Sequence, residues 1–149
     1  MKVKIAQNEQ DLQKIFALRY EVLRKPWKQV YDTSFDELDK VSINAFIEYN
    51  DICIACGRLD ILQENTAQIR YMAVHPDFKG QGLGQLILNT LEEMAISKGI
   101  EKIILHARES ALGFYLKQNY KLIRPSHVLF DTIQHYLMEK KIKNCSKDI

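Results

Sequence analysis

The segment Val74-His75-Pro76-Asp77-Phe78-Lys79-Gly80-Gln81-Gly82-Leu83-Gly84-Gln85 carries the strongest structural signal in the chain. β-branched and aromatic residues stop at His75, glycines alternate over residues 80–84, and apolar residues then recur at helical spacing. Glycine allows positive φ and close approach of a backbone to a ligand. The first amides of the following helix lack carbonyl partners and lie at its positive end. The segment therefore predicts a strand, a glycine loop and a helix N-terminus that binds an anion.

Two common phosphate-binding loops do not fit this segment. A P-loop requires Lys followed by Ser or Thr after its glycines, and Gly84 is followed by Gln85. A dinucleotide loop requires G-x-G-x-x-G, and counting from Gly80 gives Gly82 but then Gln85. A plain turn between strand and helix needs only one glycine, so the three alternating glycines indicate a specific ligand.

Strands and helices follow one another on both sides of this loop. Asn8 is expected to cap a helix that Pro26 ends, and residues 27–44 form a turn-rich segment. The other expected elements are strands over 45–49, 52–62, 68–75, 102–107, 120–124 and 132–140, and helices over 83–97 and 109–118. This order predicts a mixed α/β sheet protein whose central strand–loop–helix holds the ligand.

Length and composition limit the possible classes of protein. The 149 residues, 46% hydrophobic and 27% charged, suit one globular domain over 1–149, with a core of about 3–140 and a frayed tail over 141–149. A net charge of +2 falls short of a nucleic-acid-binding domain. The chain has neither an apolar run of membrane-spanning length nor a signal peptide, so we expect a cytoplasmic protein without membrane contact.

The cysteines predict no metal site. Cys53 and Cys56 form a C-x-x-C pattern, but no second pair completes a zinc site. An odd number of cysteines without a secretion signal indicates free thiols in a reducing compartment. We interpret Cys53 and Cys56 as small core residues of a strand.

Five segments in order along the chain resemble the GNAT acetyltransferase superfamily. Residues 79–84 resemble its acyl-CoA loop, [RQ]-x-x-G-x-[GA], and residues 70–76 resemble the strand before it. Residues 107–120 resemble the second family block, and residues 18–24 and 133–138 resemble ElaA-like members. The resemblance implies a single-domain GNAT-like α/β fold: a mixed, mostly antiparallel central sheet flanked by helices, with a splayed strand pair at the acyl-CoA site.

The resemblance also implies acetyl-CoA as the co-substrate. Strand backbone would pair with the pantetheine arm, and the loop amides would hold the pyrophosphate. Lys79 stands where the pattern has Arg or Gln, and it supplies a point charge in place of a planar fork. Arg108 either reaches a CoA phosphate or caps the end of its strand. The implied cofactor-binding residues are Met72, Ala73, Val74, Lys79, Gly80, Gln81, Gly82, Leu83, Gly84, Gln85 and Arg108.

The implied reaction moves an acetyl group from acetyl-CoA to an amine by direct attack, with Tyr115 as general acid. A phenol with a pKa of about 10 suits an alkyl thiolate of similar basicity; the alternative is a core aromatic packed beside Phe114. The general base stays open. His135 matches a histidine of the ElaA-like pattern, His106 and a water chain are alternatives, and Gln68 stands where other members carry glutamate.

The acceptor site has two candidate residues, Arg19 and Trp27. Arg19 lies among apolar positions of the first helix. It either faces the acceptor site and binds a carboxylate or a partner residue, or lays its stem on the core with its head in solvent. Trp27 and the acidic residues 32–39 lie where this superfamily builds its acceptor pocket. Those acidic residues either select a cationic amine or form a solvated loop, and we favour the loop.

The expected partner is a small-molecule or peptide amine, with no nucleic acid, and the expected assembly is a monomer or homodimer. The alternative function is a non-catalytic acyl-CoA-binding or regulatory module. A third possibility is a nucleotide-binding domain.

Overall fold

The computed structural model describes residues 1–142. Its strands are β1 (Lys4–Ile5), β2 (Ile43–Tyr49), β3 (Ile52–Ile61), β4 (Thr66–Val74), β5 (Lys102–Arg108), β6 (Lys121–Leu129) and β7 (Ile133–Lys141). Its α-helices are α1 (Glu9–Arg19), α2 (Leu83–Ser97) and α3 (Leu112–Lys117). Short helical turns are η1 (Tyr20–Arg24), η2 (Lys25–Trp27), η3 (Tyr31–Ser34), η4 (Glu37–Lys40), η5 (Pro76–Phe78) and η6 (Glu109–Ala111).

The strands form one sheet in the order β1-β2-β3-β4-β5-β7-β6. The β4–β5 pair is parallel, whereas the β1–β2, β2–β3, β5–β7 and β6–β7 pairs are antiparallel. The prediction of a mixed, mostly antiparallel sheet flanked by helices is confirmed. The short strand β1 was not predicted, and β6 runs past the expected end at Arg124 to Leu129.

The parallel pair β4–β5 covers only the first part of each strand. Its register runs from Thr66 opposite Lys102 to Ile69 opposite Leu105, whereas β4 goes on to Val74 and β5 goes on to Arg108. The β4–β5 ladder therefore spans Thr66–Ile69 of β4, and Met72–Val74 lie beyond it. A splayed strand pair requires this pattern of pairing.

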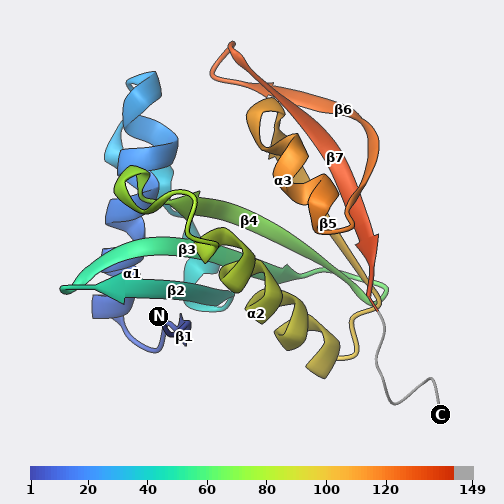
Figure 1. The fold of residues 1–149 in the computed structure, drawn as a ribbon, viewed down its shortest axis with the longest axis horizontal. Coiled ribbons are helices and arrows are strands. Elements are labelled where there is room, and N and C mark those ends of the chain that lie inside the picture. Colours follow the sequence, from blue (N-terminus) through green and yellow to red (C-terminus); the bar gives the residue numbers. More distant parts are fainter. Residues whose placement is uncertain (143–149) are drawn as a thin grey trace. The chain divides into compact units, whose positions relative to one another are not determined.

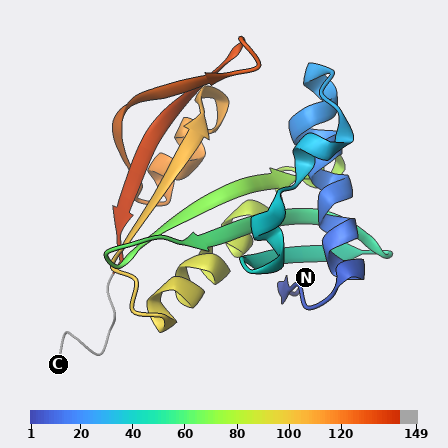
Figure 2. The same cartoon turned by 180° about the vertical axis from the view of Figure 1, so that it is seen from behind.

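The described chain forms two compact units. The first comprises Met1–Asp60 and Tyr71–Leu91, and the second comprises Ile61–Arg70 and the chain from Glu92 onward. In the first unit, α1 and the first half of α2 cover opposite faces of β2 and β3, as the two opposite views show (Figures 1 and 2). In the second unit, α3 covers one face of β5, β7 and β6 (Figures 1 and 2).

Helix α1 begins as expected and ends earlier than expected. The Asn8 side chain accepts a hydrogen bond of 2.8 Å from the Asp11 amide, which confirms the predicted cap. The helix ends at Arg19, and the chain then continues through the wide turn η1 and the turn η2, which contains Pro26. The apolar face of α1 packs on β2 and β3 through Leu12, Ile15, Phe16, Phe46, Cys53 and Cys56.

Cys53 and Cys56 are core residues of a strand, as predicted. Their exposed fractions are 2% and 1%, and both belong to the cluster under α1. The β2–β3 register passes from Ala55 to Cys53 and skips Ile54, as in a β-bulge. An extra residue reverses the alternation of faces, which explains how two residues three apart in a strand reach the same cluster.

The turn residues adopt the backbone conformations that their types favour. Asn50 and Asp51 both have positive φ, 51° and 64°, as a tight hairpin turn requires. Asn119 follows α3 with φ 70°. At the other end of the second unit, Lys141 still belongs to β7 and Ile142 donates to the Glu101 carbonyl at 2.8 Å, so the tail does not fray from 141. The rest of that prediction, over 143–149, lies outside the described residues.

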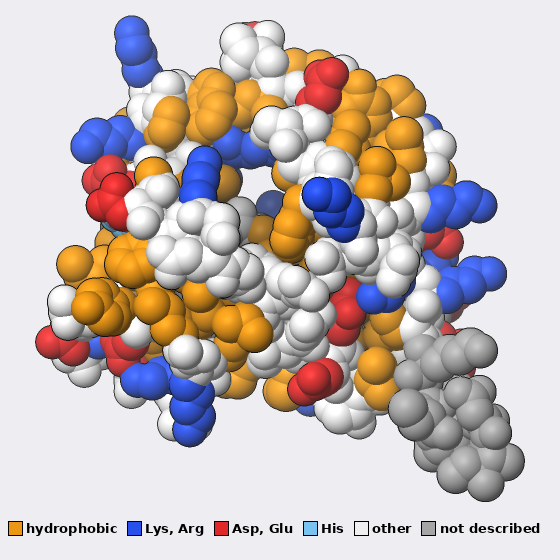
Figure 3. Space-filling model, viewed as in Figure 1, with side chains coloured by type: hydrophobic (Ala, Val, Ile, Leu, Met, Phe, Trp, Pro, Cys, Tyr) orange, Lys and Arg blue, Asp and Glu red, His pale blue; other side chains and the backbone are white. Residues whose placement is uncertain are grey.

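Hydrophobic side chains gather over the tip of the β2–β3 hairpin (Figure 3). Tyr49 and Ile52 at this tip are 51% and 59% exposed. No helix in residues 1–142 is long and apolar enough to span a bilayer.

Candidate functional site

The glycine loop leaves β4 through a short turn. The His75 ring nitrogen Nδ1 accepts a hydrogen bond of 3.1 Å from the Asp77 amide and so caps η5. Gly80 and Gly82 follow with φ of 80° and 78°, a conformation that other residues adopt only with strain. A Cβ atom built on either glycine would meet no atom within 4 Å. These glycines are therefore required by backbone conformation, and the space beside them is open.

The loop ends in the N-terminus of α2. Its first helical hydrogen bond runs from the Leu86 amide to the Gly82 carbonyl at 3.1 Å, so the amides of residues 83–85 precede any partner within the helix. Leu83 is 4% exposed and anchors this end in the core, whereas Gly82 and Gln85 lie at the surface. Gly84 lies within the first helical turn and not in the loop. Free amides at the positive end of a 15-residue helix suit an oxyanion.

The strand that leads to the loop contains a strained residue. Tyr71 has φ 56° in the middle of β4, which is rare for an aromatic residue and typical of a bulge or a functional site. Its ring is held by the guanidinium groups of Arg19 and Arg58, whose Cζ atoms lie 4.1 and 4.9 Å from its centroid. Met72, Ala73 and Val74 follow at once. Sequence reasoning missed Tyr71, because nothing in its residue type signals positive φ.

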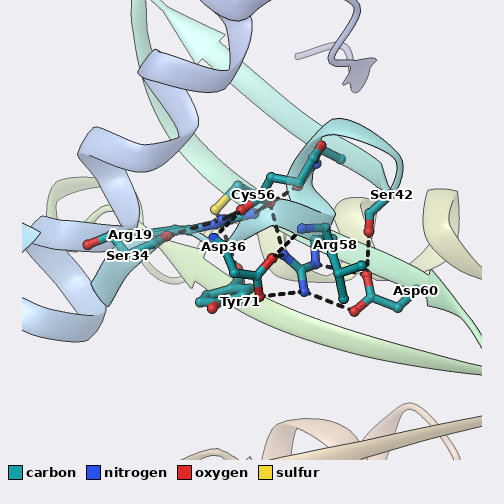
Figure 4. A network of polar contacts seen from close by, with 11 residues as sticks. Arg19, Ser34, Asp36, Ser42, Cys56, Arg58, Asp60 and Tyr71 are labelled. Atoms are coloured by element: carbon teal, nitrogen blue, oxygen red, sulfur yellow. Dashed lines mark hydrogen bonds and ion pairs between the residues drawn. The ribbon is translucent and has the colours of Figure 1, made fainter. Parts of the chain in front are cut away.

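Arg19 is a buried structural residue, which corrects the prediction that it contacts the acceptor. It is 0% exposed, and Nη1 and Nη2 donate to the Asp39 carboxylate at 3.1 and 2.9 Å (Figure 4). Nη1 also donates to the Ser34 carbonyl at 3.1 Å, and Nη2 donates to Asn44 Oδ1 at 2.8 Å. Arg19 therefore binds a partner residue, Asp39, and with no exposed surface its guanidinium contacts neither an acceptor nor solvent.

Two of the four acidic residues of segment 32–39, Asp36 and Asp39, belong to the same network, whereas Asp32 and Glu37 are exposed as in a solvated loop. Arg58 is 0% exposed and lies 2.7 Å from Asp36, 3.1 Å from Asp39 and 2.8 Å from Asp60 (Figure 4). Burial alone would raise the pKa of Asp36 and Asp39, but hydrogen bonds and charge from Arg58 and Arg19 outweigh it and lower both. These two carboxylates neutralise buried arginines, so they do not select an amine.

Trp27 closes η2 and is half-buried. Its role as a substrate-binding residue stays a prediction. In the first unit, the structure therefore brings together Met72–Val74 and the glycine loop, and it withdraws Arg19 from the candidate site.

Tyr115 lies in α3, in the second unit. It is 6% exposed, and its ring packs against Phe114 and Tyr120 at centroid distances of 5.0 and 5.8 Å. Burial raises its pKa well above that of a free phenol. Tyr115 therefore holds its proton throughout the physiological range, and both interpretations of it, proton donor and core aromatic, require burial.

His135 in β7 has a defined tautomer. Its Nδ1 lies 3.0 Å from the Ile133 carbonyl, an acceptor, so Nδ1 carries the hydrogen and Nε2 holds the lone pair in the neutral ring. The ring is 6% exposed and stacks on His127 with centroids 4.4 Å apart at 13°. His127 in turn lies 5.3 Å from His106. Burial, followed by nearby cations, lowers the pKa of His106 and His135, so both are neutral bases near pH 7.

His127 is the residue of this cluster that sequence reasoning missed. The strand expected over 120–124 stopped short of it, and only the longer β6 brings it beside β7. Arg108 ends β5 opposite His135 in the β5–β7 register and is half-buried. Its contact with CoA stays a prediction. Within residues 1–142, no three potential metal ligands converge.

The comparisons with known proteins agree with this geometry. Residues 10–120 match the model of the Acetyltransferase (GNAT) family. An uncharacterized N-acetyltransferase of Bacillus subtilis (strain 168), YjcF, is 28% identical over 140 residues that span 94% of this chain and 99% of that protein. The crystal structure of Escherichia coli ElaA has a TM-score of 0.81 at 17% identity, covering 95% of this chain and 100% of ElaA. An aminoglycoside 6′-N-acetyltransferase complexed with coenzyme A has a TM-score of 0.79 at 16% identity, with 96% and 98% covered.

Proposed function

Since the chain belongs to the GNAT family of acetyltransferases and is an acyltransferase that uses acyl-CoA, we propose that it transfers an acetyl group from acetyl-CoA to an amine of a small molecule or peptide. The glycine loop carries this proposal. Gly80 and Gly82 hold positive φ beside open space, directly before the first amides of α2, which precede the first hydrogen bond within that helix. A diphosphate needs this combination of close backbone approach and free N–H donors.

The CoA-binding residues are proposed on the fit of the loop and of β4. Lys79 and Gln81 are exposed on either side of Gly80, and the ammonium of Lys79 supplies a positive charge for the diphosphate. Tyr71 has φ 56° within β4, and Met72–Val74 follow it beyond the ladder that joins β4 to β5. Met72–Val74 are thus proposed to pair with the amide-bearing arm of CoA.

Tyr115 is proposed as the general acid. When bound, acetyl-CoA supplies a thioester whose C–S bond breaks as the amine forms the new C–N bond. Tyr115 Oη then gives its proton to the departing sulfur. A raised phenol pKa does not oppose this transfer, because desolvation that raises the pKa of the phenol raises the pKa of a neighbouring thiolate in the same direction.

His135 is proposed as the general base. Its Nδ1–H is engaged by the Ile133 carbonyl, which leaves Nε2 as the proton acceptor for the attacking amine. The cations around His135 that lower its pKa also lower the pKa of an ammonium group beside it. Both effects increase the population of neutral amine beside a neutral base.

Two measurements test the function. Calorimetry with coenzyme A should give saturable binding, and thiol release from acetyl-CoA should require an amine from a panel of small amines and peptides. Tyr115→Phe should lower kcat about 10²- to 10⁴-fold, the usual contribution of a general acid. Tyr49→Phe is the matched control, because Tyr49 is 51% exposed at the hairpin tip and should leave kcat unchanged.

The possible outcomes separate the alternatives. If Tyr115→Phe is as active as the natural protein, another group supplies the proton. Binding of coenzyme A without thiol release would favour a non-catalytic acyl-CoA-binding module. Thermal stabilisation by ATP and not by coenzyme A would indicate a nucleotide-binding domain and end the proposal.

A further inference from the structure

Tyr71 is a strained residue inside a strand. Its φ is 56°, whereas the other non-glycine residues of the described range 1–142 with positive φ lie between helices and strands. An extended chain that passes through a left-handed residue changes direction, as at a β-bulge. Backbone strain of this kind persists only where the surrounding structure holds it, and it is found mostly at functional positions. Tyr71 therefore needs contacts that offset its strain.

Two buried guanidinium groups lie against the ring of Tyr71 (Figure 4). The Cζ atoms of Arg19 and Arg58 lie 4.1 and 4.9 Å from the ring centroid, and both side chains are 0% exposed. A guanidinium that is shielded from water attracts an aromatic face more strongly than an exposed one does. Carboxylates of the acidic segment fix both arginines in turn. At the backbone, the Tyr71 carbonyl accepts a hydrogen bond of 3.5 Å from Cys56 Sγ, so ring and main chain are both held.

The side chains that follow Tyr71 are engaged in packing. Met72 fills the space that Gly57 leaves open, because a Cβ atom built on Gly57 would clash with Met72 Sδ and lie 2.8 Å from Ile87 Cγ2. Ala73 is 5% exposed and belongs to the cluster under α1. A ligand that lies along this part of β4 therefore contacts chiefly its backbone. The direction of that backbone depends on the left-handed conformation of Tyr71.

We propose that Tyr71 is a positioning residue for coenzyme A. The ring contacts with Arg19 and Arg58 hold its left-handed conformation, and this conformation directs the backbone of Met72–Val74 toward the amide-bearing arm. The inference rests on the proposed pairing of Met72–Val74 with that arm. Tyr71 acts through these three residues and not on the reacting atoms. The buried ion pairs thus serve coenzyme A binding as well as stability, because they hold the two guanidinium groups at the ring.

A series of substitutions at Tyr71 separates the ring contacts from the backbone conformation, with the Kd of coenzyme A measured by calorimetry. Tyr71→Leu keeps a large side chain without an aromatic face, so the strained conformation is populated less and binding should weaken about 5- to 100-fold. Tyr71→Phe restores the aromatic face and should recover most of this loss. Tyr71→Gly lacks the ring, but glycine adopts positive φ without strain, so it should bind coenzyme A more tightly than Tyr71→Leu does.

The order of the affinities distinguishes positioning from packing. Packing alone predicts that affinity falls with the size of the side chain, so that Tyr71→Gly binds more weakly than Tyr71→Leu. Urea unfolding shows which variants are folded under the assay conditions. If Tyr71→Gly is unfolded, Tyr71→Asn takes its place, because asparagine also tolerates positive φ. Tyr49→Leu is the matched control and should leave the Kd unchanged, since Tyr49 is 51% exposed at the hairpin tip.

The results also separate this inference from the proposed function. If the natural protein and Tyr71→Leu bind coenzyme A equally well, the positioning role is overturned and the proposed function stands. Weaker binding by Tyr71→Gly or Tyr71→Asn than by Tyr71→Leu assigns Tyr71 to packing and overturns the positioning role as well. If the natural protein shows no saturable binding of coenzyme A, the proposed function fails and the inference fails with it.

Discussion

Replacing Asp39 by Asn should destabilise the fold without touching the catalytic groups. Asp39 accepts hydrogen bonds from both terminal nitrogens of Arg19 and lies 3.1 Å from Arg58, and its side chain is 2% exposed. Asn keeps the shape but removes the charge. Arg58 retains Asp36 and Asp60, whereas Arg19 is left with two neutral acceptors. Breaking a buried ion pair from one side costs about 3–5 kcal/mol, a large part of a typical domain's stability.

Urea and thermal unfolding measure this cost. For a chain of this length, it corresponds to a fall in Tm of about 6–20 °C. Asp32→Asn is the matched control from the same segment, because Asp32 is exposed and its charge should matter by less than about 0.5 kcal/mol. If the Asp39→Asn protein is as stable as the natural one but has a raised KM for the amine, the structural role of Arg19 is refuted. Arg19 would then belong to the acceptor site.

The Asp39→Asn substitution should also change how the free energy of unfolding depends on pH in the acid range. The pKa of Asp39 is lower in the folded protein than the value near 3.9 of an unfolded chain. Its ionised form therefore stabilises the fold above about pH 4, and this contribution is lost as pH falls through the folded pKa. The free energy of unfolding of Asp39→Asn should therefore fall less on acidification than that of the natural protein, because Asp39 no longer contributes to the fall.

Three further substitutions give results that the backbone and the histidine cluster specify. Gly82→Ala places a side chain at φ 78°, so it should lower the free energy of unfolding by about 1–2 kcal/mol and weaken coenzyme A binding in calorimetry. Gly113→Ala lies in α3 with open space around it and should leave the free energy of unfolding unchanged or raise it. Asn119→Ala should cost about 1–2 kcal/mol in urea unfolding, and Asn119→Gly should cost much less, because φ is 70° there. His127→Gln removes the ring that stacks on His135 and a neighbour whose charge lowers the pKa of His135, so that pKa should rise. The acid side of the pH profile of kcat/KM should then move to higher pH. If it does not move, His135 is not the base.

The architecture was accessible from sequence because its signals are local. Asn8, Asn119 and the turn at Asn50-Asp51 all sit where their residue types favour one backbone conformation. The glycine loop could be predicted in the same way, because glycine is the residue type that most readily adopts the positive φ found at Gly80 and Gly82. Short-range chemistry thus predicted most of the elements and the backbone conformation of the glycine loop.

What the sequence did not reveal depends on partners far apart along the chain. Arg19 meets Asp39 across 20 residues, and no spacing rule shows whether a guanidinium among apolar positions reaches solvent or a buried carboxylate. Tyr71 has a left-handed backbone, and its ring lies beside two buried arginines that are distant in the sequence. His127 depends on an irregular β6–β7 register that carries the strand past its predicted end. Each of these is a tertiary effect that overrides a local preference.

The near-neutral composition hides two opposite uses of arginine. In the first unit, Arg19 and Arg58 are buried against three aspartates, so their charge is neutralised within the fold and serves stability. In the second unit, Arg70, Arg108 and Arg124 lie close enough to His106 and His135 to add to the effect of burial, which lowers the pKa of both imidazoles. The net charge of +2 sums over all of these arginines, so it does not show how the arginines of either unit are used. Charge reversal therefore has different consequences in the two units: at Arg58 it should unfold the protein, and at the exposed Arg124 it should leave the protein folded.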